Sequence, residues 1–166
     1  MAKNSSFDVS TGVDLQEVDN ALNQARKEIA TRYDFKGTDC TIELDRDAGS
    51  ILLEADDAYR LEALRGVVRE KLAKRKVPLK NLDEGKVEDA TMGRARQRIG
   101  LTQGIDKETA KKIVKDVKSE GFKKVQLAIQ GEELRVSAPK RDTLQEVIAF
   151  LRSRNYGMAL RFGNYR

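Results

Sequence analysis

Apolar residues recur along this chain with two different periods. Short segments in which apolar and polar residues alternate are typical of strands, and longer segments with apolar residues three or four positions apart are typical of helices. In chain order, the predicted strands are 7–11, 42–44, 51–55, 77–82, 95–101, 124–130, 134–136 and 160–162. The predicted helices are 15–31, 61–75, 106–118 and 144–151.

Two aspartates are predicted to begin helices. Asp14 and Glu17 have the spacing of a capping box, in which the side chain of each residue accepts a hydrogen bond from the backbone N–H of the other. Asp106 follows the pattern break at Gly104 and can cap the third helix in the same way. Residues 82–90 are polar and are predicted to be a linker between the two halves.

The order of the predicted elements repeats, because each half reads strand, helix, hairpin, helix, strand. A βαββαβ order gives an antiparallel four-stranded sheet with two helices on one face. We therefore expect an α+β protein with two ferredoxin-like domains, 1–85 and 86–166. The other face of such a sheet is often free, and RNA-binding proteins of this shape stack bases on its aromatic side chains.

Charge favours a polyanionic ligand in the second half. The whole chain of 166 residues has a net charge of +5, with −3 in residues 1–85 and +8 in residues 86–166. A basic surface attracts nucleotides and nucleic acids. We therefore expect a nucleotide or RNA phosphates to bind on the second half.

Several residue types needed for catalysis are missing. The chain has no histidine, one cysteine, no phosphate-binding P-loop and no GxGxxG. Asp45–Gly49 faintly resembles a calcium loop, but its register fails and a hairpin turn is expected. We predict no enzyme activity, no cofactor and no metal site, with Cys40 a small packed residue. An enzyme acting through carboxylates and a protein adaptor with an open sheet face stay as alternatives.

The expected location is the cytoplasm. A single cysteine allows no internal disulfide, and no apolar run approaches the ~20 residues that span a bilayer. No membrane association is therefore expected.

The first candidate site is a set of arginines. Arg94, Arg96 and Arg98 alternate with apolar or amide residues, so the three side chains share one face of a strand. Arginine forks bind phosphate oxygens in pairs. The alternative is an edge strand that charge keeps soluble.

The second candidate is the helix that follows. Its apolar positions, such as Ala110 and Ile113, share one face, and its lysines share another. The candidate phosphate-binding lysines are Lys107, Lys111 and Lys115. The alternative is an ordinary solvated face. Asp106 and Glu108 compete for the positive helix end, so we expect phosphates along the lysines and arginines and not at the helix tip.

The third candidate lies after the first helix, in residues 32–36. Tyr33 or Phe35 could stack on a base while Lys36 or Arg32 contacts its phosphate. The alternative is that these aromatic rings plug the end of the helix into the core.

Several stretches together resemble the YajQ family of small bacterial cytoplasmic proteins. They are residues 6–8, 14–18, 32–36, 96–97, 103–115, 124–126, 129–131, 141–142 and 164–166, with the block Gln103-Gly104-Ile105-Asp106-Lys107-Glu108-Thr109-Ala110-Lys111 the most specific. The resemblance covers nearly the whole chain in order.

This resemblance implies a fold and a function. It implies two ferredoxin-like domains that exchange their first strands, so that 7–11 would join the second sheet and 95–101 the first. It also implies a nucleotide-binding protein whose ligand is a nucleoside triphosphate (GTP or ATP), tRNA or cyclic di-GMP. An alternative within the family is a cyclic di-GMP-responsive regulatory adaptor that acts through contacts with a protein partner.

Overall fold

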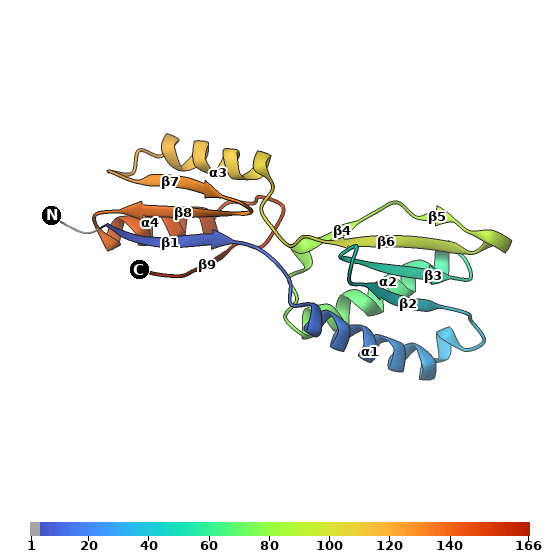
Figure 1. Ribbon diagram of the computed structural model, residues 1–166. Coiled ribbons are helices and arrows are strands. Elements are labelled where there is room, and N and C mark those ends of the chain that lie inside the picture. Colours follow the sequence, from blue (N-terminus) through green and yellow to red (C-terminus); the bar gives the residue numbers. More distant parts are fainter. Residues whose placement is uncertain (1–3) are drawn as a thin grey trace. The chain divides into compact units, whose positions relative to one another are not determined.

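The computed structural model describes residues 4–166, which form two compact units (Figure 1). One unit is continuous in sequence and comprises Val13–Gln103. The other joins the residues up to Gly12 to Gly104–Arg166. Each unit contains one antiparallel sheet and two α-helices, so the α+β class predicted from the sequence is confirmed.

The unit of residues 13–103 has a sheet with strand order β2-β3-β6-β4, and β5 also pairs with β6. Short 3-10 turns precede β2, β4 and β6. Its elements are α1 (Leu15–Thr31), η1 (Tyr33–Phe35), β2 (Thr41–Asp45), β3 (Ser50–Ala55), α2 (Ala58–Lys74), η2 (Leu79–Asn81), β4 (Leu82–Glu84), β5 (Glu88–Asp89), η3 (Thr91–Gly93) and β6 (Ala95–Leu101).

The second unit has the corresponding order β7-β8-β1-β9. Its elements are β1 (Ser5–Ser10), α3 (Lys107–Ser119), β7 (Gln126–Gln130), β8 (Glu133–Ala138), α4 (Arg141–Arg152) and β9 (Arg161–Gly163). In this sheet an interior strand comes from a distant part of the sequence, because β1 lies between β8 and β9. In the other sheet the last strand of the unit is interior, because β6 lies between β3 and β4.

Burial explains why β1 belongs to this sheet. Phe7 and Val9 have no exposed surface and lie opposite Val136 and Leu134 of β8. The alternate residues of β1 point to the other face, as a two-residue period requires. The strand therefore contributes two fully buried side chains to a core that is otherwise built from residues after Gly104.

Both predicted helix caps are present. The Asp14 carboxylate accepts from the Gln16 N–H over 2.9 Å, and Asp106 accepts from the Thr109 N–H over 3.1 Å. The second half of the predicted capping box is different: Glu17 accepts from Arg75, 2.8 Å away, at the end of α2. The cap of α1 thus comes from Asp14, while Glu17 ties the two helices of the unit together.

Residues 82–90 are not merely a linker, which corrects the sequence prediction. Leu82 pairs with Leu101, and Glu88 pairs with Arg96, so β4 and β5 both extend along β6. The alternation of apolar and polar residues that marks a strand is missing from β4 and β5. Both strands lie at the edge of the sheet, and their side chains are mostly exposed to water. The piece expected to be extended at 77–82 contains the turn η2.

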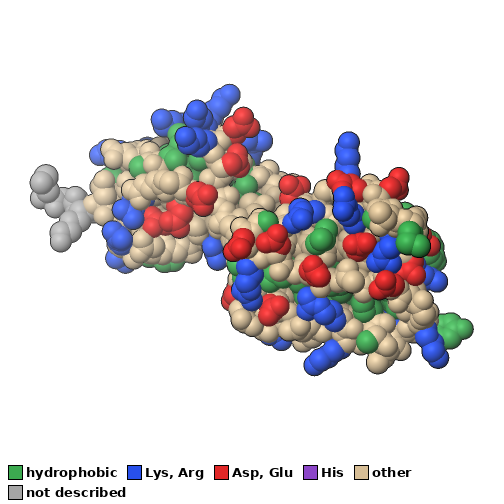
Figure 2. Space-filling view, turned by 45° about the vertical axis from the view of Figure 1, so that its right-hand side comes forward, with side chains coloured by type: hydrophobic (Ala, Val, Ile, Leu, Met, Phe, Trp, Pro, Cys, Tyr) green, Lys and Arg blue, Asp and Glu red, His purple; other side chains and the backbone are tan. Residues whose placement is uncertain are grey.

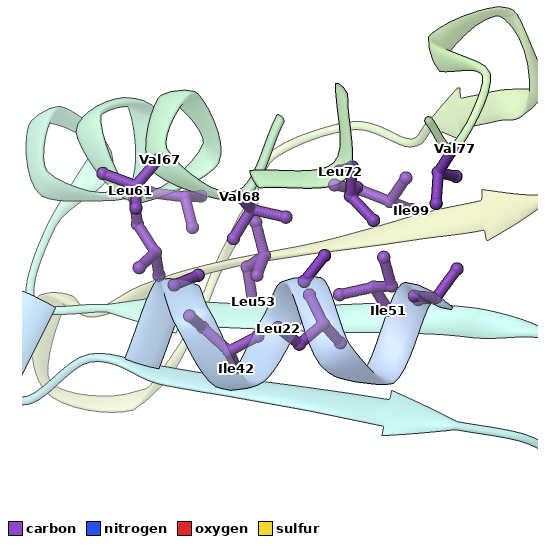
Figure 3. Packing of buried hydrophobic residues seen from close by; sticks show 14 of the residues in the cluster. Leu22, Ile42, Ile51, Leu53, Leu61, Val67, Val68, Leu72, Val77 and Ile99 are labelled. Atoms are coloured by element: carbon purple, nitrogen blue, oxygen red, sulfur yellow. The ribbon is translucent and has the colours of Figure 1, made fainter. Parts of the chain in front are cut away.

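Each unit has its own hydrophobic core. In the unit of residues 13–103, side chains from both helices meet the helix-facing sides of β3 and β6 (Figure 3). Leu22, Ile51, Leu53 and Ile99 in this core have no exposed surface. The helices thus cover one face of each sheet and leave the other face open.

Candidate phosphate-binding surfaces

Arg94 is enclosed by acidic groups. Its Nε donates to Glu54 Oε1 over 3.0 Å, its Nη2 donates to the Asp39 carbonyl oxygen over 2.7 Å, and the Asp56 carboxylate lies 3.8 Å from Nη1. The hydrogen bond to Glu54 is the main cause that raises the pKa of this guanidinium above its ordinary value. Only 20% of the side chain is exposed, so Arg94 offers a phosphate little free surface.

Arg96 and Arg98 project from the open face of β6, as the alternation predicted. Because β6 lies between β3 and β4, it is an interior strand, and the edge-strand alternative is wrong. Arg96 Nε lies 3.2 Å from Glu88, and Arg98 Nη1 donates to Ser50 Oγ over 2.6 Å and lies 3.7 Å from Asp45. Both side chains are about half exposed, so these ion pairs are weak and a phosphate could displace them.

The surroundings of these arginines are nonetheless acidic. Arg98 lines a hollow of about 530 Å³ together with Glu43, Asp45 and Asp47. Strand pairing puts Glu54 and Glu88 beside Arg96 on the same face. An anion approaching this sheet face therefore meets carboxylates before it meets a free guanidinium, which weakens the case for phosphate binding here.

The lysines of α3 have a different environment. Lys107, Lys111, Lys115 and Lys118 follow one another at intervals of three or four residues and are all exposed. No carboxylate lies within ion-pair distance of any of them among residues 4–166. We call these four residues the lysine row; Figure 2 shows blue side chains gathered over the α3 side of this unit.

Apolar contacts hold α3 so that the lysine row faces water. Ala110, Ile113 and Val117 are buried in the core of the unit, and Val114 is half-buried at the border of the row. The acidic Asp116 of α3 is engaged elsewhere: it accepts from the Tyr156 hydroxyl over 2.8 Å and from Arg154 over 3.2 Å. It therefore does not neutralise the row.

The tip of α3 is already occupied by its own cap. Asp106 accepts from both the N–H and the hydroxyl of Thr109, and these bonds lower the pKa of its carboxyl below the ordinary value. A negative carboxylate at this end competes with any ligand phosphate.

The aromatic candidates of residues 32–36 separate. Phe35 is only 4% exposed and packs into the core of its unit, with the Arg32 guanidinium 5.6 Å from its ring centre. Tyr33 is 90% exposed and could take a stacked base, and Lys36 lines a neighbouring hollow beside Arg26 and Ile42. Phe35 thus plugs the helix end, as the structural alternative for these rings proposed.

The candidate groups are divided between the two units. Arg94, Arg96, Arg98 and residues 32–36 belong to the unit of residues 13–103, whereas the lysine row belongs to the other unit. The strand pairings also show that no described strand places an aromatic residue on either open sheet face, because Phe7 and Phe162 share the helix-facing side with Val9. Base stacking on a sheet face, as in RNA-binding proteins of this shape, is not available here.

One small hollow in the second unit was not predicted from the sequence. About 270 Å³ in volume, it is lined by Phe7, Arg141, Gln145, Tyr165 and Arg166, among others. Tyr165 is 60% exposed, so an aromatic ring and two guanidinium groups border the same space. In the sequence, the adjacent aromatic and cationic residues 165 and 166 were the feature that could have indicated this site. The fold was needed to show that α4 and β1 lie beside them.

The described part of the chain holds no group of three or more His, Cys, Asp or Glu side chains able to bind a metal ion. None of its helices combines the length and apolar character needed to cross a membrane.

Known proteins resemble this chain over almost its full length. Residues 5–166 match the family model described as "Nucleotide-binding protein YajQ-like". A protein of Magnetococcus marinus is 50% identical over 161 residues, which cover 97% of this chain and 98% of that protein. Proteins of Koribacter versatilis and Bacillus cereus are 48% and 49% identical over all 166 residues of this chain, covering 99% and 100% of those proteins. All three are named nucleotide-binding proteins, and none carries an enzyme name.

Proposed function

The chain belongs to the YajQ family of nucleotide-binding proteins, and on that premise we propose that it binds nucleotide or RNA phosphates along the lysine row and does no chemistry on them. The observation that carries this proposal is a row of four exposed lysines that no described carboxylate neutralises. Each lysine is a point charge with three donors for phosphate oxygens. The ligands to consider are GTP or ATP, cyclic di-GMP and tRNA.

The length of the row favours a ligand with several phosphates. Lys107 and Lys118 are eleven residues apart, which corresponds to about 16 Å along a helix axis. A single phosphate group would contact only one or two of these side chains. A strand of RNA, or a nucleotide with linked phosphates, could contact more of them at once.

The strand order supports a fold assignment that goes with this proposal. In the sheet β7-β8-β1-β9 the first strand of the unit is interior and adjoins the third and fourth strands, in the order 2-3-1-4. In the sheet β2-β3-β6-β4 the same interior place is taken by β6, the last strand of its unit. We infer that both units are ferredoxin-like, with two helices on one sheet face. Binding through a helix surface would set this protein apart from relatives in shape that stack bases on the open sheet.

The proposal is tested with two matched triple variants. Lys107, Lys111 and Lys115 are replaced by alanine in one, and Lys27, Lys80 and Lys86, exposed in the other unit, in the control. Both lose three positive charges. Binding of labelled tRNA, ATP, GTP and cyclic di-GMP is measured by fluorescence anisotropy over a salt series. The first variant is expected to bind tRNA at least ~10-fold more weakly, with a salt slope lower by about 3, because each phosphate contact on a nucleic acid contributes about one unit.

A third variant compares the contribution of the arginines to binding with that of the lysines. Replacing Arg94, Arg96 and Arg98 by alanine is expected to weaken binding less than the lysine variant, because carboxylates already engage all three guanidinium groups. Equal binding by the lysine variant and its control, with intact circular dichroism, would refute the lysine row as the site. A larger loss in the arginine variant would move the site to the open face of β6.

A Tyr165 variant tests whether the protein also recognises the base of its ligand. If the hollow beside Tyr165 holds a nucleobase, Tyr165→Ala weakens binding of all the nucleotides but leaves their salt slope unchanged, because stacking releases no counterions. If only phosphates are recognised, this variant binds as the wild type does.

A further inference from the structure

The edge strand β7 lacks the protection that edge strands usually have. Its sequence, Gln-Leu-Ala-Ile-Gln, contains no charged residue and no proline. Among residues 4–166 it pairs with β8 alone, and four of its five residues are exposed. Edge strands present unpaired N–H and C=O groups, and proteins normally guard them with charge, proline, short length or a covering segment.

The other sheet edges are protected. In the sheet of the unit 13–103, the equivalent edge strand is β2, which carries Glu43 and Asp45. Its Ile42 carbonyl oxygen accepts two hydrogen bonds from the Arg26 guanidinium, over 3.0 and 2.7 Å. The edges β9 and β4 are only three residues long. Within residues 4–166, no group outside β8 hydrogen-bonds to β7 in a comparable way.

A partly apolar groove runs beside this edge. Ile129 lies opposite the buried Leu134, so its side chain points to the helix-covered side of the sheet, yet it is 44% exposed. Together with Val114, Lys111, Lys115 and Lys118 it lines a hollow of about 440 Å³. The groove thus has an apolar floor and a cationic rim on the same side of the sheet.

We propose that β7 is a docking site at which an extended acidic segment of a protein partner adds a fifth strand to this sheet. The main chain of the segment hydrogen-bonds to the outward groups of β7. On the helix-covered side, an apolar side chain of the segment packs on Ile129 and Val114, and its carboxylates lie beside the lysines. The lysine charge selects an acidic partner, and the strand edge selects an extended one.

A second copy of this chain fits the edge less well. Pairing of two β7 strands would bring two sets of uncompensated lysines to a single seam. Like charges at such short range repel, whereas an acidic segment neutralises them. Charge complementarity therefore favours a different protein as the partner.

The test uses a labelled peptide in which alternate residues read Glu, Val, Glu with threonine between them. Its control has the same sequence and charge, but the amides on one edge are N-methylated and cannot donate. Binding is measured by anisotropy on the full chain, and hydrogen exchange of the β7 amides is measured with and without peptide. We expect N-methylation to weaken binding at least tenfold, and the unmodified peptide to slow exchange in β7.

Protein variants separate the two parts of the groove. Ile129→Ala should weaken binding of the peptide, because it removes the apolar contact, and should leave the binding of tRNA and nucleotides unchanged. Replacing Lys111, Lys115 and Lys118 by alanine should also weaken binding of the peptide. The control variant at Lys27, Lys80 and Lys86 should bind the peptide as the wild type does.

Several outcomes would overturn the docking site. Equal binding of the N-methylated peptide would reduce the interaction to charge attraction, and unchanged exchange in β7 would place the peptide elsewhere. A dimer in sedimentation experiments whose β7 amides are already protected would assign the edge to a second copy. Because phosphate binding does not need the strand edge, it can fail or succeed independently of these results.

Discussion

Arg135 Nε donates to Asp8 Oδ1 over 2.9 Å, joining two residues 127 positions apart in the sequence. The pair lies on the open face of the second unit, where Asp8 of β1 is directly opposite Arg135 of β8. Asn164 also donates to Asp8, over 2.6 Å. One carboxylate thus ties the first strand of the chain to β8 and to the C-terminal segment.

Removing this charge should loosen β1. Asp8→Asn is expected to lower the free energy of unfolding by about 1.5–3 kcal/mol, the range for hydrogen bonds to charged groups, because the Asp8 side chain is only 14% exposed. Asp47→Asn, in an exposed turn without an ion pair among the described residues, is the matched control and should change stability by less than about 0.5 kcal/mol. Urea unfolding followed by circular dichroism measures both. Equal midpoints would show that Asp8 does not hold the strand.

Acid should destabilise the protein through specific carboxylates. Hydrogen bonds from Arg135 lower the pKa of Asp8 below 3.8, and hydrogen bonds from Lys71 lower that of Glu28 below 4.5. The folded state therefore binds fewer protons than the unfolded state, so this stabilisation is full above the ordinary pKa values and disappears as the pH falls through the lowered ones. Urea midpoints measured from pH 7 down to about 3 should fall below about pH 5. The double variant Asp8→Asn, Glu28→Gln should show a shallower fall; an identical fall would assign acid sensitivity to other groups.

Fragments test how the chain divides. Residues 13–103 contain every strand of one sheet, including β6, so this fragment should melt cooperatively on its own. Residues 1–85 lack β6 and leave Ile51 and Leu53 without their neighbouring strand, so this fragment should be poorly folded. Circular dichroism and thermal melts compare the two. A cooperative melt of 1–85 would support a division after residue 85 instead.

Two glycines should respond to alanine in opposite ways. A Cβ at Gly104 would lie 2.7 Å from Glu132 Cβ, which is attached to the backbone and cannot easily move, so Gly104→Ala should destabilise the protein. A Cβ at Gly66, exposed within α2, meets no atom within 4 Å, and Gly66→Ala should stabilise it by up to about 1 kcal/mol because alanine is the better helix former. Thermal unfolding of both variants gives the comparison. A shift of the same sign in both would contradict the packing argument at Gly104.

Much of the candidate site followed from spacing alone. The sequence predicted that Arg94, Arg96 and Arg98 share a face and that the lysines line one side of a helix, because both follow from fixed backbone periods. It could not predict that Glu54, Glu88 and Asp45 meet the arginines, since those residues arrive through strand pairing. Long-range pairing also left β7 with an open edge, and no described carboxylate lies within ion-pair distance of the lysine row.

The sequence by itself determined the identity and order of most helices and strands, including the caps at Asp14 and Asp106, because these depend on residues within a few positions of one another. Tertiary structure decided which sheet each interior strand completes. Phe7 and Val9 form an alternating strand that could fill a core in either unit, and nothing local distinguishes the two. The choice rests on contacts such as Asp8 with Arg135, whose free energy appears only once the distant strands are side by side.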